Sequence, residues 1–254
     1  MTPPRRPPTP DYARGGVTVY HADCRAVLPS FPGGSVDFVL TDPPYLVSYR
    51  GRWGRGGRPI AGDDGPGDWL LPAYAELRRV LRPDGFCVSF YGWPHADAFL
   101  GAWRAAGFRP VSHLAFVKRQ WGFGRFTRGR HETAFVLAKG RPPKPARAIA
   151  DVIDWRRERA TVHPNQKPVA SLTPLLASLA PPGGLVLDPF MGSGSTLLAA
   201  RALGLPAVGV EVDRAHCEAA VRRLAGDDPL SPSGGPVVAD LFSAADPGGG
   251  PSPC

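Results

Sequence analysis

Two short motifs contain residues whose types and spacing could do chemistry. The first is Asp42-Pro43-Pro44-Tyr45, which follows an apolar run at 36–40. Consecutive prolines lack backbone N–H groups and cannot continue a central strand, so the chain must turn out of a sheet here. The Asp42 carboxylate and the Pro43 carbonyl could accept the two hydrogens of an exocyclic base amine, which would localise its lone pair for attack. Tyr45 offers a ring on which a flipped base could stack, and an ordinary Asp-Pro turn is the alternative.

The second motif is a glycine-rich loop that joins an expected strand at 185–187 to an expected helix at 193–203. Its residues are Asp188, Pro189, Phe190, Met191, Gly192, Ser193, Gly194, Ser195 and Thr196. Small residues let a ligand approach the backbone, and the helix N-terminus presents free N–H groups. Glu211 ends the next expected strand, where an acid can accept hydrogen bonds from ribose hydroxyls. Together these features indicate a cofactor that contains adenosine, with a plain tight turn as the alternative.

The residues of this loop do not suit every adenosine cofactor. A dinucleotide fingerprint needs a third glycine or alanine where Leu197 stands, and the phosphate loop of nucleotide hydrolases needs a lysine that is absent. A carboxylate at Asp188 would repel a pyrophosphate, whereas it would attract a cofactor that carries a sulfonium and an amino group. The loop therefore favours a cofactor with a sulfonium and an amino group over one with a pyrophosphate.

Both motifs must be positioned by the elements around them. Apolar patterns predict strands at 17–20, 36–40, 86–91, 114–118, 133–139, 185–187 and 207–212. They predict helices at 24–28, 69–81, 95–106, 168–179, 193–203 and 214–224, the last capped by Asp213. This alternation predicts an α/β fold with a doubly wound, mostly parallel sheet. Asp42, Asp188 and Glu211 would then share its carboxyl edge, where such proteins bind ligands.

The composition of the chain favours a polyanionic partner. Its formal net charge is +8 over 254 residues, and phosphates reward lysine and arginine through counterion release. A basic protein without such a partner is the alternative. The four cysteines show no CxxC spacing, so they indicate neither a metal site nor a redox motif and suggest a reducing cytoplasm. No apolar run approaches the ~18 residues that span a bilayer.

We expect a single domain at 17–225 between two disordered tails, which are rich in proline and arginine at 1–16 and in glycine, proline and serine at 226–254. Two basic and aromatic loops lie inside the domain, at 46–68 and 119–130. Their candidate DNA-binding residues are Arg50, Arg52, Trp53, Arg55, Arg58, Arg119, Trp121, Arg125, Arg128 and Arg130. Such residues can bind phosphates and stack on bases, although a solvated charged surface is the alternative.

At these motifs the sequence resembles the DNA amino-methyltransferases, which modify adenine N6 or cytosine N4. The turn at 42–45 looks like their catalytic motif, and the loop at 188–196 looks like their cofactor loop. The segment His163-Pro164-Asn165-Gln166-Lys167-Pro168 resembles one that the permuted beta subgroup carries before that loop. In this subgroup the catalytic half precedes the cofactor half, as it does here. The resemblance covers residues 17–225.

The resemblance implies a circularly permuted methyltransferase fold, with a seven-stranded sheet and an antiparallel hairpin at its edge, formed by 114–118 and 133–139. It implies that Asp42, Pro43, Pro44 and Tyr45 are catalytic. It assigns the S-adenosylmethionine site to Asp23, Asp188, Phe190, Gly192, Ser193, Gly194, Thr196 and Glu211, with His163 and Lys167 either lining the pocket or bracing it. The region at 140–162 is short and irregular, and leaves little room for target recognition.

The reaction implied is direct methyl transfer to a flipped base in double-stranded DNA, without a metal ion. Adenine N6 is favoured, because the cytosine-N4 members more often carry serine where Asp42 stands; cytosine N4 is the alternative. Two other classes stay open, namely a nicotinamide-dependent oxidoreductase and a non-catalytic DNA-binding relative. A homodimer and a cognate restriction enzyme of a restriction-modification system are further partners left open.

Overall fold

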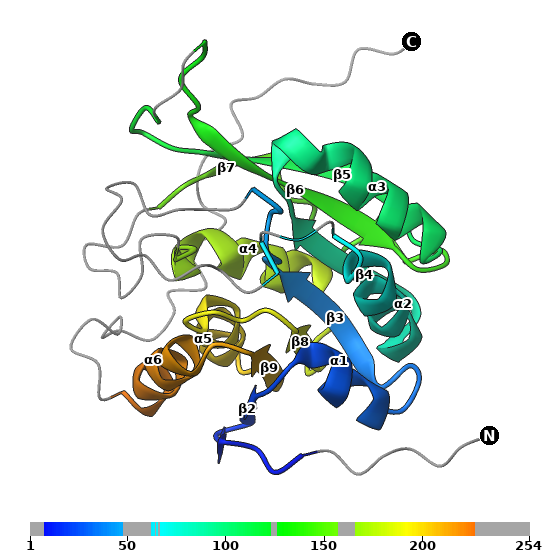
Figure 1. Ribbon diagram of the computed structural model, residues 1–254, viewed down its shortest axis with the longest axis vertical. Coiled ribbons are helices and arrows are strands. Elements are labelled where there is room, and N and C mark those ends of the chain that lie inside the picture. Colours follow the sequence, from blue (N-terminus) through cyan, green and yellow to red (C-terminus); the bar gives the residue numbers. More distant parts are fainter. Residues whose placement is uncertain are drawn as a thin grey trace.

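A single sheet with helices on both faces organises the chain (Figure 1). The structure is a computed structural model and describes residues 8–47, 62–63, 65, 67–122, 126–156 and 166–226. The strands are β1 (Tyr12–Arg14), β2 (Val17–His21), β3 (Val36–Thr41), β4 (Leu81–Phe90), β5 (Arg109–Val117), β6 (His131–Ala138), β7 (Val152–Asp154), β8 (Val186–Asp188) and β9 (Ala207–Glu211). The helices are α1 (Cys24–Val27), α2 (Leu70–Val80), α3 (Ala96–Ala105), α4 (Val169–Leu179), α5 (Ser195–Ala202) and α6 (Arg214–Ala225), with short 3-10 turns η1 (Leu28–Ser30) and η2 (Trp93–His95).

The strands lie in the order β1-β2-β9-β8-β3-β4-β6-β5-β7. The five strands from β2 to β4 in this order run parallel, so their carboxyl ends meet at one edge. Strand β6 runs antiparallel to both β4 and β5. The predicted doubly wound, mostly parallel sheet with an antiparallel hairpin is therefore confirmed.

The sheet buries a separate apolar layer on each face. On one face, Phe38 and Leu40 of β3 pack with residues of α4, α5 and α6. On the other face, Val39 packs with residues of α1, α2 and α3. This alternation along β3 follows from the period of two in a strand, and it leaves both faces of the central strands without water. None of the described helices has the length and apolarity that a membrane crossing would need.

Two three-residue strands extend the seven expected ones. We expected a disordered tail at 1–16, but of its described part Tyr12–Arg14 forms β1, because Gly15 and Gly16 adopt φ of 58° and 77° and fold it back onto β2. The Tyr12 hydroxyl then donates to the Leu224 carbonyl at the end of α6, at 3.4 Å. Within the irregular region at 140–162, β7 pairs with β5, so the hairpin lies one strand in from the edge. Neither strand buries a residue, so neither has the apolar run that predicted the others. Residues 1–7 and 227–254 of the expected tails lie outside the described residues.

The boundary between α2 and β4 also differs from the expectation. We expected a helix at 69–81 and a strand at 86–91, with the turn-forming pair Asp84-Gly85 between them. The structure ends α2 at Val80 and starts β4 at Leu81. The register against β3 shifts between the pairs Val36↔Leu81 and Phe38↔Phe86, and Asp84 has a φ of 54°. The turn-forming residues therefore form an irregularity inside the strand rather than a helix end.

Candidate active site

Four acidic residues lie along the carboxyl edge of the parallel strands, as predicted. Asp42 follows β3, Asp188 ends β8, Glu211 ends β9, and Asp23 lies two residues after β2. Strands β3 and β8 are neighbours in the sheet, as are β8 and β9. The Asp42 turn and the glycine loop therefore flank each other, although their motifs are far apart in sequence.

The Asp42 turn is held by an internal hydrogen bond and by close packing. The Tyr45 hydroxyl donates to Asp42 Oδ1 at 2.6 Å. Pro43 is buried, and Pro44 and Tyr45 are partly buried. Gly92, just after β4, lies against Tyr45: a Cβ atom added there would come within 2.7 Å of the Tyr45 Cβ. Only glycine leaves room for the tyrosine in this position.

Lys167 lies on the Asp42 turn rather than at the glycine loop. Its ammonium donates to Asp42 Oδ2 at 2.5 Å and to the Tyr45 hydroxyl at 3.2 Å. It also lies 4.8 Å from the centre of the Phe90 ring. Its side chain is only 8% exposed. The resemblance had suggested that Lys167 lines the cofactor pocket or braces it. Its contacts with two residues of the Asp42 turn were not expected from the sequence.

Glu132, the second residue of β6, binds the same lysine. Lys167 Nζ lies 3.0 Å from Glu132 Oε2, and Lys118 Nζ lies 2.5 Å from Glu132 Oε1. Burial raises the pKa of Glu132, but the two lysines outweigh it and hold the pKa below its usual range. Burial likewise lowers the pKa of Lys167, but Asp42 and Glu132 together raise it above its usual range. We call Asp42, Lys118, Glu132 and Lys167 the lysine–carboxylate network.

The glycine loop has the backbone that its sequence requires. Gly192 and Gly194 adopt φ of 51° and 81°, and Gly194 precedes α5 as its N-cap. A Cβ at Gly194 would lie 3.0 Å from the Cβ of Ala220 in α6, so α5 and α6 approach closely here. A Cβ at Gly192 would meet no atom within 4 Å. The loop therefore presents an open backbone face at Gly192, which a ligand could approach.

Asp188 is a buried carboxyl group at the start of this loop. It is 3% exposed and accepts a hydrogen bond from the Phe190 N–H at 3.1 Å. Burial raises its pKa to about 7, although hydrogen bonds from Thr196 and Phe190 partly oppose this. A cation placed beside Asp188 would favour its ionised form. The group therefore suits a positively charged ligand.

The other two acids have partners within the protein. Glu211 accepts hydrogen bonds from the Gly192 N–H at 2.9 Å and the Asp213 N–H at 2.8 Å, so it links the end of β9 to the glycine loop. Asp23 caps α1 by accepting from the Arg25 N–H at 2.8 Å, and its carboxylate pairs with the Arg25 guanidinium at 2.6 Å. Glu211 thus contacts the loop directly, whereas Asp23 contacts α1.

Two further residues contact the loop at Ser193. Arg223 of α6 is 1% exposed, and its Nη1 donates to the Ser193 carbonyl at 2.6 Å. The Ser193 hydroxyl donates to Gln166 Oε1 at 3.4 Å. Gln166 therefore touches the glycine loop while its neighbour Lys167 touches the Asp42 turn. Arg223 could not be singled out from the sequence, because it lies among other charged residues of α6.

The loop at 119–130 carries a stack of cations on an aromatic ring. The guanidinium groups of Arg128 and Arg130 lie 5.8 and 5.1 Å from the centre of the Trp121 ring, and Arg119 is exposed. Trp121 is 55% exposed, and Trp93, three residues after the end of β4, is 81% exposed. Of the other candidate residues, Arg50, Arg52, Trp53, Arg55, Arg58, Arg125 and His163 lie outside the described residues.

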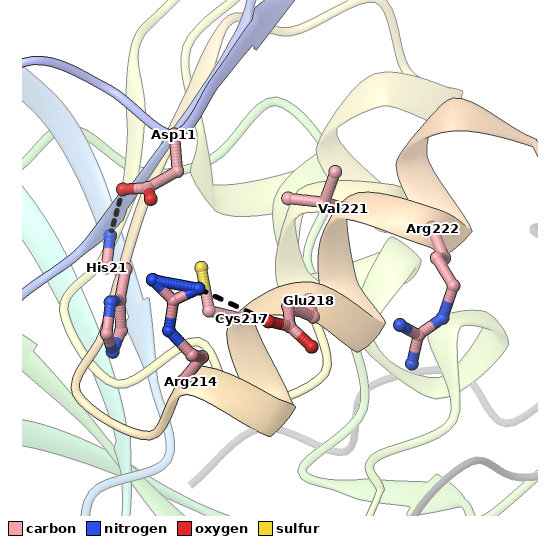
Figure 2. Close-up of a pocket in the computed structure, with 7 residues that line it drawn as sticks. All are labelled: Asp11, His21, Arg214, Cys217, Glu218, Val221 and Arg222. Atoms are coloured by element: carbon pink, nitrogen blue, oxygen red, sulfur yellow. Dashed lines mark hydrogen bonds and ion pairs between the residues drawn. The ribbon is translucent and has the colours of Figure 1, made fainter.

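A separate pocket lies between the start of β1, the end of β2 and α6. Figure 2 shows its lining residues, which are Asp11, His21, Arg214, Cys217, Glu218, Val221 and Arg222. Asp11 accepts the His21 N–H at 2.8 Å, and Arg214 pairs with Glu218 at 3.4 Å. These polar groups bind one another, so we assign the pocket no part in the site.

The fold and the two motifs define a class of DNA-modifying protein. The DNA methylase family matches residues 36–222. The chain therefore belongs to the family of DNA amino-methyltransferases that modify adenine N6 or cytosine N4. The Asp42 turn precedes the glycine loop in its sequence, which is the order expected for the permuted subgroup.

Two proteins of Escherichia coli (strain K12) are similar to this chain. "Putative methylase YubD" is 47% identical over 203 residues, which cover 80% of this chain and 88% of that protein. "DNA adenine methyltransferase YhdJ" is 26% identical over 244 residues, which cover 82% of each chain. Among solved structures, the PvuII DNA methyltransferase (cytosine-N4-specific) has a TM-score of 0.70 at 19% identity, and covers 84% of this chain and 87% of its own. The M1.HpyAVI-SAM complex has a TM-score of 0.65 at 23% identity, and the match covers 82% of this chain and 98% of that chain.

Proposed function

We propose that this chain transfers a methyl group from S-adenosylmethionine to the N6 amine of a flipped adenine in double-stranded DNA. The observation that carries the proposal is the pairing of Tyr45 with the Asp42 carboxylate at the end of β3, beside the glycine loop that follows β8. An acceptor for amine hydrogens and a cofactor loop are thereby brought to one point of the sheet edge.

The residues of the turn divide the work on the base. Asp42 and the Pro43 carbonyl accept the two N–H hydrogens of the amine, which localises its lone pair toward the methyl donor. The ring of Tyr45 stacks on the flipped base and fixes its plane. Pro43 and Pro44 hold the turn rigid, and such positioning is a large part of catalysis.

The residues of the glycine loop fit S-adenosylmethionine. Asp188 is a buried acid with a pKa raised to about 7, so it gains from a cationic amino group beside it. The open backbone face at Gly192 admits a ligand, and Glu211 has lone pairs left for ribose hydroxyls. When bound, the cofactor supplies a methyl group on a positively charged sulfur. We assign Phe190, Ser193, Gly194 and Thr196 to the wall of this site, with Asp23 as a more distant contact.

Adenine is favoured over cytosine on two grounds. Asp42 is a carboxylate, and YhdJ, which is called a DNA adenine methyltransferase, is similar over most of both chains. Cytosine N4 is the second candidate, because the PvuII enzyme is called cytosine-N4-specific and has the higher TM-score of the two solved structures. Both reactions use the same acceptor chemistry on an exocyclic amine.

The DNA partner is supported by the charge and by one exposed surface. The chain carries a formal net charge of +8, and Arg128 and Arg130 lie over the ring of Trp121 on the loop after β5, where Arg119 is also exposed. Cations contact phosphates, and an exposed indole can stack on bases. A homodimer and a cognate restriction enzyme remain predictions.

The test is methyl transfer from tritiated S-adenosylmethionine to DNA from a methylation-deficient strain. Wild-type protein should label the DNA, and mass spectrometry of the digested nucleosides should find N6-methyladenine. Asp42→Ala should abolish labelling, whereas Asp97→Ala, an exposed acid of α3, should not. Wild-type protein that binds DNA but transfers no label would instead be a non-catalytic relative, and N4-methylcytosine would establish the second candidate.

A further inference from the structure

Both carboxylate oxygens of Asp42 already have partners before any base arrives. Oδ1 accepts from the Tyr45 hydroxyl at 2.6 Å, and Oδ2 accepts from Lys167 at 2.5 Å. A target amine must nevertheless donate one hydrogen to this carboxylate under the proposed function. An ammonium held on Oδ2 also neutralises the charge that would stabilise the amine as it becomes positive during methyl transfer. Each oxygen keeps a second lone pair, so the charge of Lys167, rather than a lack of acceptor sites, is what opposes the reaction at Asp42.

Lys167 is the partner that has somewhere else to go. Its ammonium lies 3.0 Å from Glu132 Oε2, on the side of the site formed by β6. The side chain is 8% exposed, and the rings of Tyr45 and Phe90 lie 5.4 and 4.8 Å from the charge. A buried ammonium that lost every anionic partner would be strongly destabilised. It can leave Asp42 only if a second carboxylate keeps it.

Glu132 has no part in the chemistry proposed for the base, yet it is the second partly buried acid at this point. Lys118 binds its other oxygen at 2.5 Å. The network thus contains two lysines and two carboxylates, and its charges balance. If Lys167 shifts fully to Glu132, the charge balance of the network is kept, while the charge of Asp42 is no longer neutralised by a bound ammonium.

We propose that Glu132 is a holding site for Lys167: when the target amine enters, Lys167 leaves Asp42, stays on Glu132, and so leaves the full negative charge of Asp42 to stabilise the amine. Lys167 and Glu132 are positioning residues, because neither touches the reacting atoms. In the free protein Lys167 neutralises the Asp42 carboxylate. In the complex with DNA it pairs with Glu132 instead. This rests on the proposed function.

The proposal makes an unusual prediction for paired variants. Glu132→Gln keeps the shape of the side chain but removes the charge that holds Lys167, so the lysine stays on Asp42. The single-turnover rate of methyl transfer at pH 8 should fall about tenfold or more, the effect of ~1.4 kcal/mol on the barrier. Adding Lys167→Met removes the blocking cation and should recover much of that loss. If the network were only structural, the second substitution would add a further defect.

The measurement is made at saturating enzyme and S-adenosylmethionine, with DNA affinity and thermal melting followed in parallel. DNA affinity should change less than about twofold, because neither residue contacts phosphate in the proposed role. Glu218→Gln, an exposed acid of α6, is the matched control. Inactive wild-type protein would reject the proposed function itself. Active wild-type protein with an unaffected Glu132→Gln variant, or with a double variant no faster than Glu132→Gln, would reject the holding site alone.

If Glu132→Gln does not fold, the wild-type protein can answer the same question. In protein labelled with 15N-lysine, the Lys167 ammonium signal is assigned by its loss in Lys167→Arg. Asp42→Asn leaves Glu132 as the anionic partner of Lys167, and so marks the position of the released lysine. S-adenosylhomocysteine is then added with an unmethylated oligonucleotide that contains the sequence which the protein methylates. The Lys167 signal of the wild type should move toward its position in Asp42→Asn. A signal that DNA leaves unmoved would overturn the proposal.

Discussion

Gly92 offers a test of the turn that leaves every proposed chemical group in place. The substitution Gly92→Ala adds one methyl group beside Tyr45. Gly92 has a φ of −85°, which alanine adopts freely, so the substitution introduces no backbone strain of its own. Its effect must come from the contact with the turn.

The size of that contact follows from two distances. The added Cβ would lie 2.7 Å from the Tyr45 Cβ and 2.9 Å from the Tyr45 carbonyl oxygen. Carbon atoms in contact prefer at least about 3.5 Å, so the turn must move by roughly 0.8 Å (3.5 − 2.7). A displacement near 1 Å at reacting groups can cost roughly 10²-fold in rate. Overpacking of this kind costs about 1–3 kcal/mol of stability, which is about 2–12 °C in Tm for a chain of this size.

The assay is single-turnover transfer of tritiated methyl groups, with thermal unfolding measured on the same preparations. Gly101→Ala is the matched control, because a Cβ at Gly101 in α3 meets no atom within 4 Å. Alanine there should stabilise the helix by about 0.5–1 kcal/mol and leave the rate unchanged. A folded Gly92→Ala protein that transfers methyl groups as fast as the wild type would refute the role given to this packing.

Three further substitutions probe other parts of the site. Because burial raises the pKa of Asp188 to about 7, the wild-type affinity for S-adenosylmethionine should rise between about pH 6 and 7.5 as the carboxylate forms, and Asp188→Asn should bind weakly and without this rise, as calorimetry can measure. Arg223→Met should lose about 1–3 kcal/mol of stability in denaturant unfolding by leaving the Ser193 carbonyl without its donor, whereas the exposed neighbour Arg222→Met should change little. Arg130→Gln should weaken DNA binding and reduce the slope of log K against log salt by about one, and an unchanged slope would remove Arg130 from the DNA surface.

The positions of Asp42, Asp188 and Glu211 could be predicted because each follows a short apolar run that a parallel sheet must bury. The ends of such runs fall at one edge whatever the loops do. The same reasoning failed for β1 and β7, because these strands bury none of their three residues, whereas the equally short β8 is buried throughout. It also failed at Asp84-Gly85, where turn-forming residues lie inside a strand.

The contacts of Lys167 could not be predicted from sequence. Its partner Asp42 is 125 positions away, and Glu132 begins a strand whose first residues gave no functional signal. The resemblance pointed to the segment that contains Lys167, but not to the motif that it touches. Such contacts depend on how α4 and β6 approach β3 in space. Local patterns carry no information on that approach.

The hydrogen bond between Tyr12 and the Leu224 carbonyl bears on how this chain is connected. It joins β1, the first described element, to α6, the last described element. Relinking the chain at this point and opening it elsewhere would change the order of the motifs in sequence while keeping each strand beside the same neighbours. The candidate site depends on which strand ends are neighbours. The coding segments can therefore change their order in the gene while the residues of the site keep their positions in the fold.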